Sequence, residues 1–370
     1  MNTPLVSAAY GDIPQATVAP ENEPPVEIIK PIAVEGYGVA SDSSSPYSCA
    51  PPPPTANEGA SLEINTVNDN SLTDSALRSA LAQVVDTHCC WSKNVYKNMI
   101  IKTADHSDAF YIIWETFNET RSTAWTSEPY RGQNIDTPNM GMAPLPWSIA
   151  INGPDYFINQ TQQVHVPHTD SVSSCLNCNG RGRIVCDNCN GRGSTFCNTC
   201  NGSGHNGDNR CSFCNGNGRR RCSYCSGSGR LRCHKCDGHG RVVNFVQLTV
   251  VFKNNVFERV IDISGMPSEE LKKGQGELLC QQKDYLLNPP TNHPDQRING
   301  ACIELFNQSK NFIQSSQGRL LQQRVTVSYI PVTKAIATRK DKDFTFYVYG
   351  LDNKAFTNEY PATCCGCLDF

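Results

Sequence analysis

Twelve of the chain's 20 cysteines stand in pairs that open the same eight-residue pattern, Cys-x-x-Cys-x-Gly-x-Gly, which occurs six times between Cys175 and Gly240. A Cys-x-x-Cys turn presents two thiolates to one metal ion, and two such turns complete a tetrahedral zinc site of four sulfurs. The glycines permit the positive φ with which a chain reverses close to a metal. The predicted zinc ligands are Cys175, Cys178, Cys186, Cys189, Cys197, Cys200, Cys211, Cys214, Cys222, Cys225, Cys233 and Cys236.

The spacing of the six copies predicts which of them share a metal ion. Successive copies begin 11, 11, 14, 11 and 11 residues apart, a series that is the same in either direction. This symmetry favours an antiparallel hairpin with its tip at residues 205–210. The third copy would then face the fourth, the second would face the fifth, and the first would face the sixth. Twelve thiols in this arrangement predict three zinc ions, whereas pairing of sequence neighbours, the alternative, would not require the symmetry.

We infer the cellular compartment from two features that the sequence does not show, a signal peptide and a membrane span. The first 15 residues hold no basic cluster followed by an apolar run, and no stretch approaches the roughly 18 apolar residues of a membrane span. We therefore expect a cytoplasmic protein, with the nucleus as an alternative, in which thiols stay reduced and bind metal. Cys364, Cys365 and Cys367 near the C-terminus are candidates for lipidation, which would make the protein peripheral to a membrane.

Four segments are expected along the chain. Residues 1–60 are rich in Pro, Ser, Ala and Gly and are predicted to form a disordered tail, because they offer too little apolar surface to offset the entropy of ordering. Residues 61–170 and 245–370 show mixed helical and strand patterns, and residues 171–244 hold the repeats. The predicted fold class is α+β: the two flanking α/β segments form one body, with a zinc-stapled antiparallel β-hairpin arm inserted between them.

Individual elements are predicted from periodicity and turn signals. A helix is expected behind the capping candidates Ser71 and Thr73, ending near residues 89–91. Residues 99–101 and 110–114 are predicted to form one hairpin, and residues 245–252 and 256–263 another that turns at Asn254-Asn255. The remaining predictions are short strands at 147–151 and 164–166, a helix at 297–316, and strands at 325–330 and 344–349.

Two other functions use the same cysteine segment. Cys-x-x-Cys is also the motif of thiol–disulfide oxidoreductases and isomerases, but such a site needs one reactive pair, whereas six matched pairs indicate a scaffold. Residues 175–240 carry nine Arg and one Lys against three Asp, and Arg219-Arg220-Arg221 suggests an RNA-binding module. Three zinc ions (+6) with twelve thiolates (−12) bring the loaded arm close to neutrality, which does not favour nucleic acid. A closed four-thiolate site has no open coordination position, so no enzymatic activity is expected.

The repeats resemble the cysteine-rich zinc domain of DnaJ-type co-chaperones, which carries four copies. Six copies with α+β flanks are similar to the Ssu-two homologue family, and the resemblance covers residues 70–370 through segments 85–90, 115–121, 166–168, 321–324 and 364–367. It implies zinc binding and, by analogy with DnaJ, contact with unfolded polypeptides or heat-shock chaperones. We therefore predict a chaperone-like or co-chaperone-like interaction protein. An extended partner would be received by strand addition at Ile184, Val185, Phe196, Phe213, Tyr224 and Leu231.

Several other residues that could do chemistry are predicted to be structural. His293-Pro294-Asp295 spells the tripeptide of a J domain, but Pro289 and Pro290 would break the helix that a J domain places before it. Four cysteines are expected to be buried as small apolar residues, and two histidines to serve as capping or core residues. These are Cys89, Cys90, Cys280 and Cys302, and His165 and His168.

Overall fold

The computed structural model describes residues 29–37, 60–65, 71–290 and 293–361. They divide into two compact units, each described by itself below. Unit 1 takes its residues from 1–42, 125–142 and 167–245, and unit 2 from 43–124, 143–166 and 246–370. The fold is mixed α/β and consists mostly of strands. Most of the predicted N-terminal tail, and Cys364, Cys365 and Cys367, lie outside the described residues.

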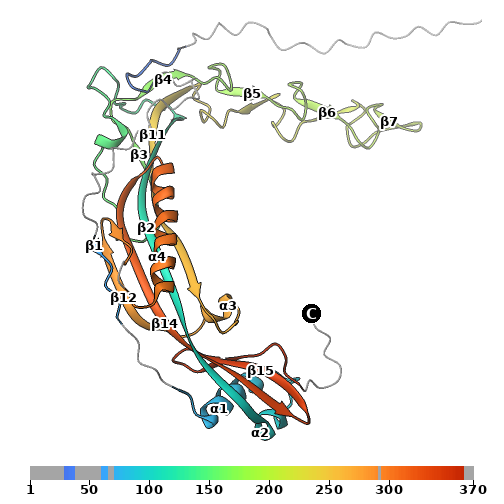
Figure 1. Cartoon of the computed structure of the whole chain (residues 1–370). Helices are drawn as coiled ribbons and strands as arrows, with labels where there is room; N and C mark the ends of the chain where they lie inside the picture. The colour runs from blue at the N-terminus through green and yellow to red at the C-terminus, as the bar shows by residue number, and fades with distance from the viewer. Residues whose placement is uncertain (1–28, 38–59, 66–70, 291–292, 362–370) are drawn as a thin grey trace, which may run out of the picture. The chain divides into compact units, whose positions relative to one another are not determined.

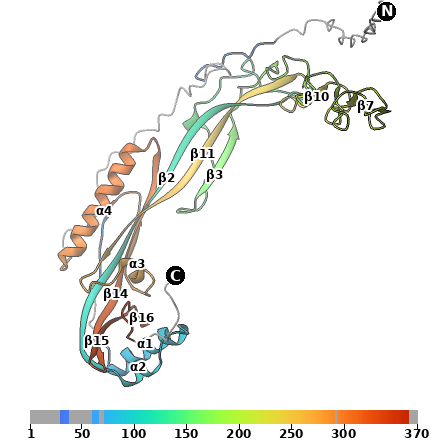
Figure 2. The ribbon, with the colours of Figure 1, turned by 90° about the vertical axis from the view of Figure 1, so that its right-hand side faces the viewer.

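An antiparallel sheet of long strands forms the body of unit 2, apart from residues 125–129 and 241–245 at the ends of two strands, which belong to unit 1. Its order is β16 (Lys354–Phe356), β15 (Lys342–Tyr349), β14 (Arg319–Arg339), β2 (Ile100–Pro129), β11 (Arg241–Ile261) and β3 (Gln160–His165). β12 (Glu277–Asp284) pairs with β14, and β1 (Ala60–Ser61) pairs with β13 (Leu287–Asn288). β3 lies beside β11 in both views (Figures 1 and 2). The strands predicted at 164–166, 325–330 and 344–349 are thus confirmed in type.

The helices of unit 2 pack on this sheet. They are α1 (Asp74–Thr87), α2 (Asn94–Asn98), η1 (a 3-10 helix, Pro146–Ser148), α3 (Ser268–Leu271) and α4 (Gln296–Ser315). The Thr73 hydroxyl accepts a hydrogen bond from the Ala76 amide and caps α1, as predicted. α4 lies along β2 and β14 (Figure 1), where the ring of Phe306 meets Trp114 edge-on with centroids 5.8 Å apart. The helix predicted at 297–316 is therefore confirmed.

Both predicted hairpins are wrong, because each pair of short strands is one continuous strand. The polar residues 104–108 pair with residues 331–335 of β14 and stay in the ladder. At the second predicted turn, the side-chain amide of Asn254 donates to Glu115 and that of Asn255 to the Thr116 carbonyl, both on β2. Cross-strand partners thus satisfy polar groups that would otherwise favour a turn.

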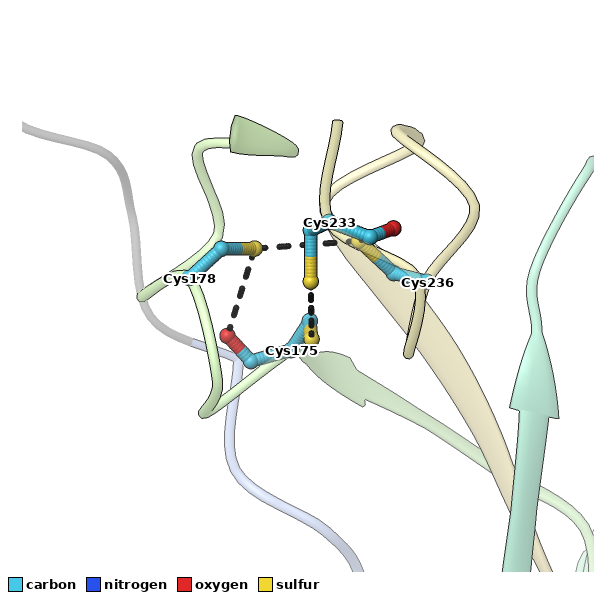
Figure 3. Close-up of side chains that lie close together, drawn as sticks. All are labelled: Cys175, Cys178, Cys233 and Cys236. Atoms are coloured by element: carbon cyan, nitrogen blue, oxygen red, sulfur yellow. Dashed lines mark hydrogen bonds between the residues drawn. The ribbon is translucent and has the colours of Figure 1, made fainter. Parts of the chain in front are cut away.

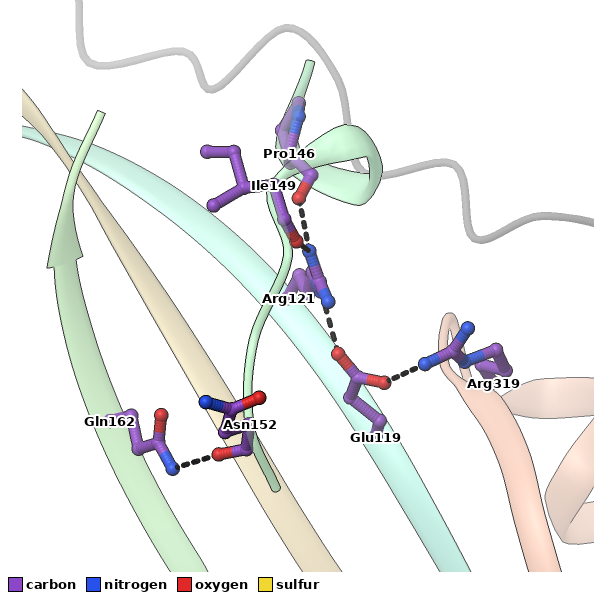
Figure 4. Close-up of polar contacts among 7 residues, drawn as sticks. All are labelled: Glu119, Arg121, Pro146, Ile149, Asn152, Gln162 and Arg319. Atoms are coloured by element: carbon purple, nitrogen blue, oxygen red, sulfur yellow. Dashed lines mark hydrogen bonds and ion pairs between the residues drawn. The ribbon is translucent and has the colours of Figure 1, made fainter. Parts of the chain in front are cut away.

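The strand predicted at 147–151 is also wrong, and Figure 4 shows why. The Arg121 guanidinium donates to the carbonyls of Pro146 and Ile149 at 2.5 and 2.8 Å, so these groups have no need of a strand partner. The buried carboxylate of Glu119 accepts from Arg121 at 2.6 Å and from Arg319 at 2.5 Å. A side-chain network therefore holds the 3-10 turn against β2.

Candidate metal centres

Three short strand pairs in unit 1 build a hairpin from the cysteine repeats. β5 (Arg183–Val185) pairs with β10 (Arg230–Arg232), β6 (Ser194–Phe196) with β9 (Arg219–Arg221), and β7 (His205–Asn206) with β8 (Asn209–Arg210). β4 (Ser171–Ser174) pairs with residues 241–244 of β11, so the chain enters and leaves the hairpin on adjacent strands. The predicted antiparallel hairpin and its tip at residues 205–210 are confirmed.

The twelve repeat cysteines form three buried groups of four, and within each group the sulfurs lie within 4.8 Å of one another. The first and sixth copies share the outer cluster, the second and fifth the middle cluster, and the third and fourth the tip cluster. The groups are Cys175, Cys178, Cys233 and Cys236; Cys186, Cys189, Cys222 and Cys225; and Cys197, Cys200, Cys211 and Cys214. The nested pairing predicted from the spacing is confirmed, and the adjacent alternative is wrong.

The sulfur positions fit a tetrahedral metal site. In the outer cluster the sulfurs of Cys175 and Cys233 lie 3.8 Å apart and those of Cys178 and Cys236 lie 3.7 Å apart (Figure 3). The corresponding distances are 3.9 and 3.7 Å in the middle cluster and again in the tip cluster. Four sulfurs at about 2.3 Å from one zinc ion are separated by about 3.8 Å. Each cluster can therefore hold one metal ion.

The backbone of each cluster is tied across the hairpin. The Cys175 amide donates to the Gly240 carbonyl at 2.8 Å, the Cys233 amide donates to Gly182 at 2.9 Å, and the middle and tip clusters repeat this reciprocal pair. In all six copies the amide of the second glycine donates to the second cysteine's sulfur at 3.2 to 3.3 Å. Donors directed at sulfur stabilise a thiolate, which is the form that binds metal.

Two asparagines add a donor that the sequence did not single out. The side-chain amides of Asn177 and Asn188 donate to the sulfurs of Cys233 and Cys222, both at 3.2 Å. The Asn188 bond, together with the backbone amide of Cys225, lowers the pKa of Cys222 to about 6. Thr199 holds the equivalent position in the third copy, so the tip cluster lacks an asparagine there. The sequence offered one signal for these donors: only the first two of the six copies have Asn at the third position.

Several arginines in the second half of the hairpin, residues 209–240, make hydrogen bonds to other groups of the same hairpin. The Nε atoms of Arg210, Arg221 and Arg232 donate to the backbone carbonyl five residues further on, at 2.7 to 2.9 Å. Arg219 donates to the Ser194 hydroxyl at 3.0 Å and lies over the ring of Phe196 at 4.7 Å. Two of the three arginines in the predicted RNA-binding patch therefore have structural contacts within the hairpin.

The four cysteines outside the repeats that the structure describes divide into two pairs. Cys280 on β12 and Cys302 on α4 are buried in one core cluster, as predicted, and burial raises the pKa of Cys302 to about 12. The prediction is wrong for Cys89, which is exposed, and for Cys90, which is half-buried. These two residues follow the end of α1 at Thr87 and lie in a turn rather than on its buried face.

The histidines take structural positions. The backbone and Nδ1 of His168 both contact the Asp136 carboxylate, at 2.8 and 2.6 Å. The predicted capping or core role is wrong for His165, which is an exposed residue of β3. Asp295 caps α4 by accepting from the Arg297 amide, and the described elements before it are the strands β12 and β13, not a basic helix. The His293-Pro294-Asp295 tripeptide is thus a helix cap.

This nested arrangement defines a class of protein, those built on a cysteine-rich hairpin of the DnaJ type. The chain is 38% identical over 301 residues to Protein SSUH2 homolog of Homo sapiens, covering 80% of both chains. It is 40% identical over 298 residues to Protein SSUH2 homolog of Danio rerio, covering 80% of this chain and 82% of the relative. The chain belongs to the SSUH2 homolog family. No family model matches it, and no solved structure does.

The sequence predicts no membrane-spanning segment, and the length and polarity of the described helices test that prediction. Among the residues that the structure describes, every helix is too short or too polar to cross a bilayer.

Proposed function

We propose that the three clusters bind zinc and that the zinc-loaded hairpin, an arm inserted between the flanking α/β segments, binds unfolded polypeptide. Four cysteines per cluster, their sulfur separations and the amide donors on sulfur support zinc as the metal. Zinc in such a site is structural: it ties the two halves of a hairpin whose strands are only two or three residues long. The chain's own residues then make every contact with a partner.

The observation that carries this proposal is a set of large apolar side chains exposed on the arm. Phe196, Phe213 and Tyr224 are 60, 63 and 75% exposed, and Val185 is 57% exposed. Single exposed apolar residues are ordinary, but several on one metal-tied hairpin indicate a surface for apolar partners. Unfolded chains offer such segments, so a chaperone-like or co-chaperone-like role fits best.

Two of the residues predicted to contact an extended partner pack instead against the cysteine clusters. Ile184 packs against the outer cluster and Leu231 against the middle one, and both are partly buried. The strand pairs of the arm are also too short to offer a long edge for strand addition. We therefore assign binding to exposed side chains rather than to the arm's strand edges.

We propose no catalytic role. All twelve repeat cysteines are buried, and four thiolates on one zinc ion leave no open position for a substrate. Four of the arm's ten basic residues, Arg210, Arg219, Arg221 and Arg232, have structural contacts that do not involve nucleic acid.

The test is suppression of aggregation by the full-length, zinc-loaded protein acting on a chemically denatured client. Replacing Phe196, Phe213 and Tyr224 by Ser should raise the protein concentration needed for half-suppression by about tenfold or more, as expected for aromatic anchors. Replacing the equally exposed Met140, Met142 and Leu145 by Ser is the matched control and should change little. Zinc content of both variants must stay at the wild-type value.

Three outcomes would contradict the proposal. If the variant lacking Phe196, Phe213 and Tyr224 suppressed aggregation as well as wild type, these exposed residues of the arm would not be the binding site. Efficient insulin reduction by the zinc-loaded protein would favour an oxidoreductase. Salt-sensitive RNA binding that is lost when Arg219, Arg220 and Arg221 become Ala would favour a nucleic-acid module.

A further inference from the structure

Residues 29–37, within the predicted disordered tail, are ordered and belong to unit 1. The backbone of Ile29 makes two hydrogen bonds to one residue of β4: its amide donates to the Ser174 hydroxyl, and its carbonyl accepts from the Ser174 amide, both at 2.9 Å. Among the described residues β4 has one strand partner, β11. The Ser174 amide that binds Ile29 is therefore not used in that ladder, and Ile29 binds the other edge of β4.

Apolar side chains anchor the far end of the same segment. Val34 and Tyr37 are each only 3% exposed. The Tyr37 amide donates to the Val34 carbonyl at 3.0 Å across a turn in which Gly36 has φ +82°. The indole Nε1 of Trp125 donates to the Tyr37 carbonyl at 3.0 Å. Backbone and side chains both hold the segment, which is how extended peptides are recognised at sheet edges.

A cavity of about 720 Å³ opens beside the Ile29 end of the segment. Its walls come from the segment itself, from β4 and β11, and from the first and sixth cysteine copies. Apolar atoms of Pro31, Leu176 and Val242 line it, with Lys235 among the polar residues. Leu176 is 80% exposed, so this wall is accessible. A volume of this size accepts one or two large side chains.

We propose that the outer edge of β4 and Trp125 form a binding groove for an extended apolar polypeptide, that residues 29–37 occupy it as an intramolecular ligand, and that the cavity beside Ile29 is the unfilled part of the same groove. This inference rests on the proposed function, because it adds a second contact site for the same class of partner. A client must displace residues 29–37 before it can bind. The client's apparent affinity is therefore its intrinsic affinity multiplied by the fraction of time for which residues 29–37 leave the groove free.

The experiment measures binding of a fluorescent peptide with the sequence of residues 29–37 to the full-length, zinc-loaded protein. Val34→Asp places a carboxylate in a buried position and should release the chain's own segment. If the segment fills the groove for about 90% of the time or more, this variant binds the peptide about tenfold more tightly than wild type, or tighter still. Ile32→Asp is the matched control, since Ile32 is 54% exposed in the same segment, and it should bind as wild type does.

Adding Leu176→Asp to the Val34→Asp variant should abolish the gain, because it places a carboxylate in the apolar lining of the cavity. Equal binding by wild type and Val34→Asp, or a gain that survives Leu176→Asp, would overturn the inference. Neither result would affect the aggregation assay, which depends on Phe196, Phe213 and Tyr224. Failure of that assay with a retained gain in peptide binding would instead reject the arm as the polypeptide site.

A second measurement does not depend on how the variants fold. Saturating heavy-isotope-labelled wild-type protein with the peptide should speed amide exchange at the protein's own residues 32–37, since one groove holds one segment. Unchanged exchange at saturation would show that the peptide binds elsewhere.

Discussion

A methyl group on Gly240 would lie 2.1 Å from the carbonyl oxygen of Gly180, in the copy that faces it across the hairpin. The reciprocal contact, from Gly182 to the Gly238 carbonyl, would be 2.2 Å. The middle and tip clusters repeat the relationship at 2.2 to 2.4 Å. The second glycine of each copy is thus required by the close approach of its partner as well as by its positive φ. The glycines therefore allow two facing copies to approach closely enough to share a cluster.

Gly240→Ala should open the outer cluster. The added methyl group meets backbone that is held by the reciprocal Cys175 and Cys233 hydrogen bonds and cannot move away freely. We expect bound zinc to fall from three ions per chain to two, measured by native mass spectrometry. Gly207→Ala at the tip is the control, because Gly207 also has positive φ but has open space around it, and it should keep three ions. Loss of zinc in both variants would assign the effect to φ alone.

Replacing two of the four cysteines of a cluster should make the other two accessible to alkylation. In a Cys186→Ser, Cys189→Ser variant, the nested clusters predict that Cys222 and Cys225 become reactive, because they lose their metal partners. Alkylation under native conditions followed by peptide mapping identifies the labelled thiols. Labelling of Cys175 and Cys178 in their place would contradict the pairing seen in the structure.

Zinc should leave the tip cluster before the other two. The outer and middle clusters each gain an amide donor on sulfur, from Asn177 and Asn188, and such supporting bonds change metal affinity by roughly 10- to 100-fold. In a chelator titration monitored by thiol alkylation, Cys197 should be labelled first. Asn188→Ala should make the middle cluster release zinc about tenfold more readily, and Asn198→Ala, which removes an exposed amide, should not. Simultaneous release in wild type would refute this order.

Glu115→Gln should destabilise the protein at neutral pH but not in acid. Burial by itself would raise the Glu115 pKa, but hydrogen bonds from Arg324 and Asn254 outweigh it and lower that pKa below its usual value. The stabilisation is therefore complete above the unfolded value of about 4.3 and is lost as the pH falls through the folded-state pKa.

Urea unfolding should show a loss of about 2 kcal/mol for Glu115→Gln at pH 7, since a partly buried Arg324 is left unpaired, and a much smaller loss near pH 3. Comparing variant with wild type at each pH cancels the protonation of zinc ligands. Asp343→Asn, which breaks the exposed pair with Lys102, is the control and should change little at either pH. An equal loss for Glu115→Gln at both pH values would exclude the charge as its cause.

The cysteine clusters could be predicted from the sequence because their information is local and symmetric. Each copy carries its own ligands and turns, and the linker lengths alone distinguish nested from adjacent pairing. α1 and α4 were likewise predictable from their periodicity and caps. These features depend on residues near one another in the chain.

The long strands could not be predicted, because distant residues decide them. Asn254 and Asn255 favour a turn until Glu115 and Thr116 of β2 satisfy their amides. The Arg121 contacts that replace a strand at 147–151, and the seating of Ile29 on Ser174, also join positions far apart in the sequence. Local propensity gives no account of such partners.

The central claim, that nested cysteine clusters each hold one zinc ion, is tested most directly by native mass spectrometry of the full-length, reduced protein. The account predicts the mass of the chain plus three zinc ions, and loss of one ion when Cys186 and Cys222 are replaced by Ser. Two or fewer ions on the wild-type chain, or loss of two ions from that variant, would contradict it.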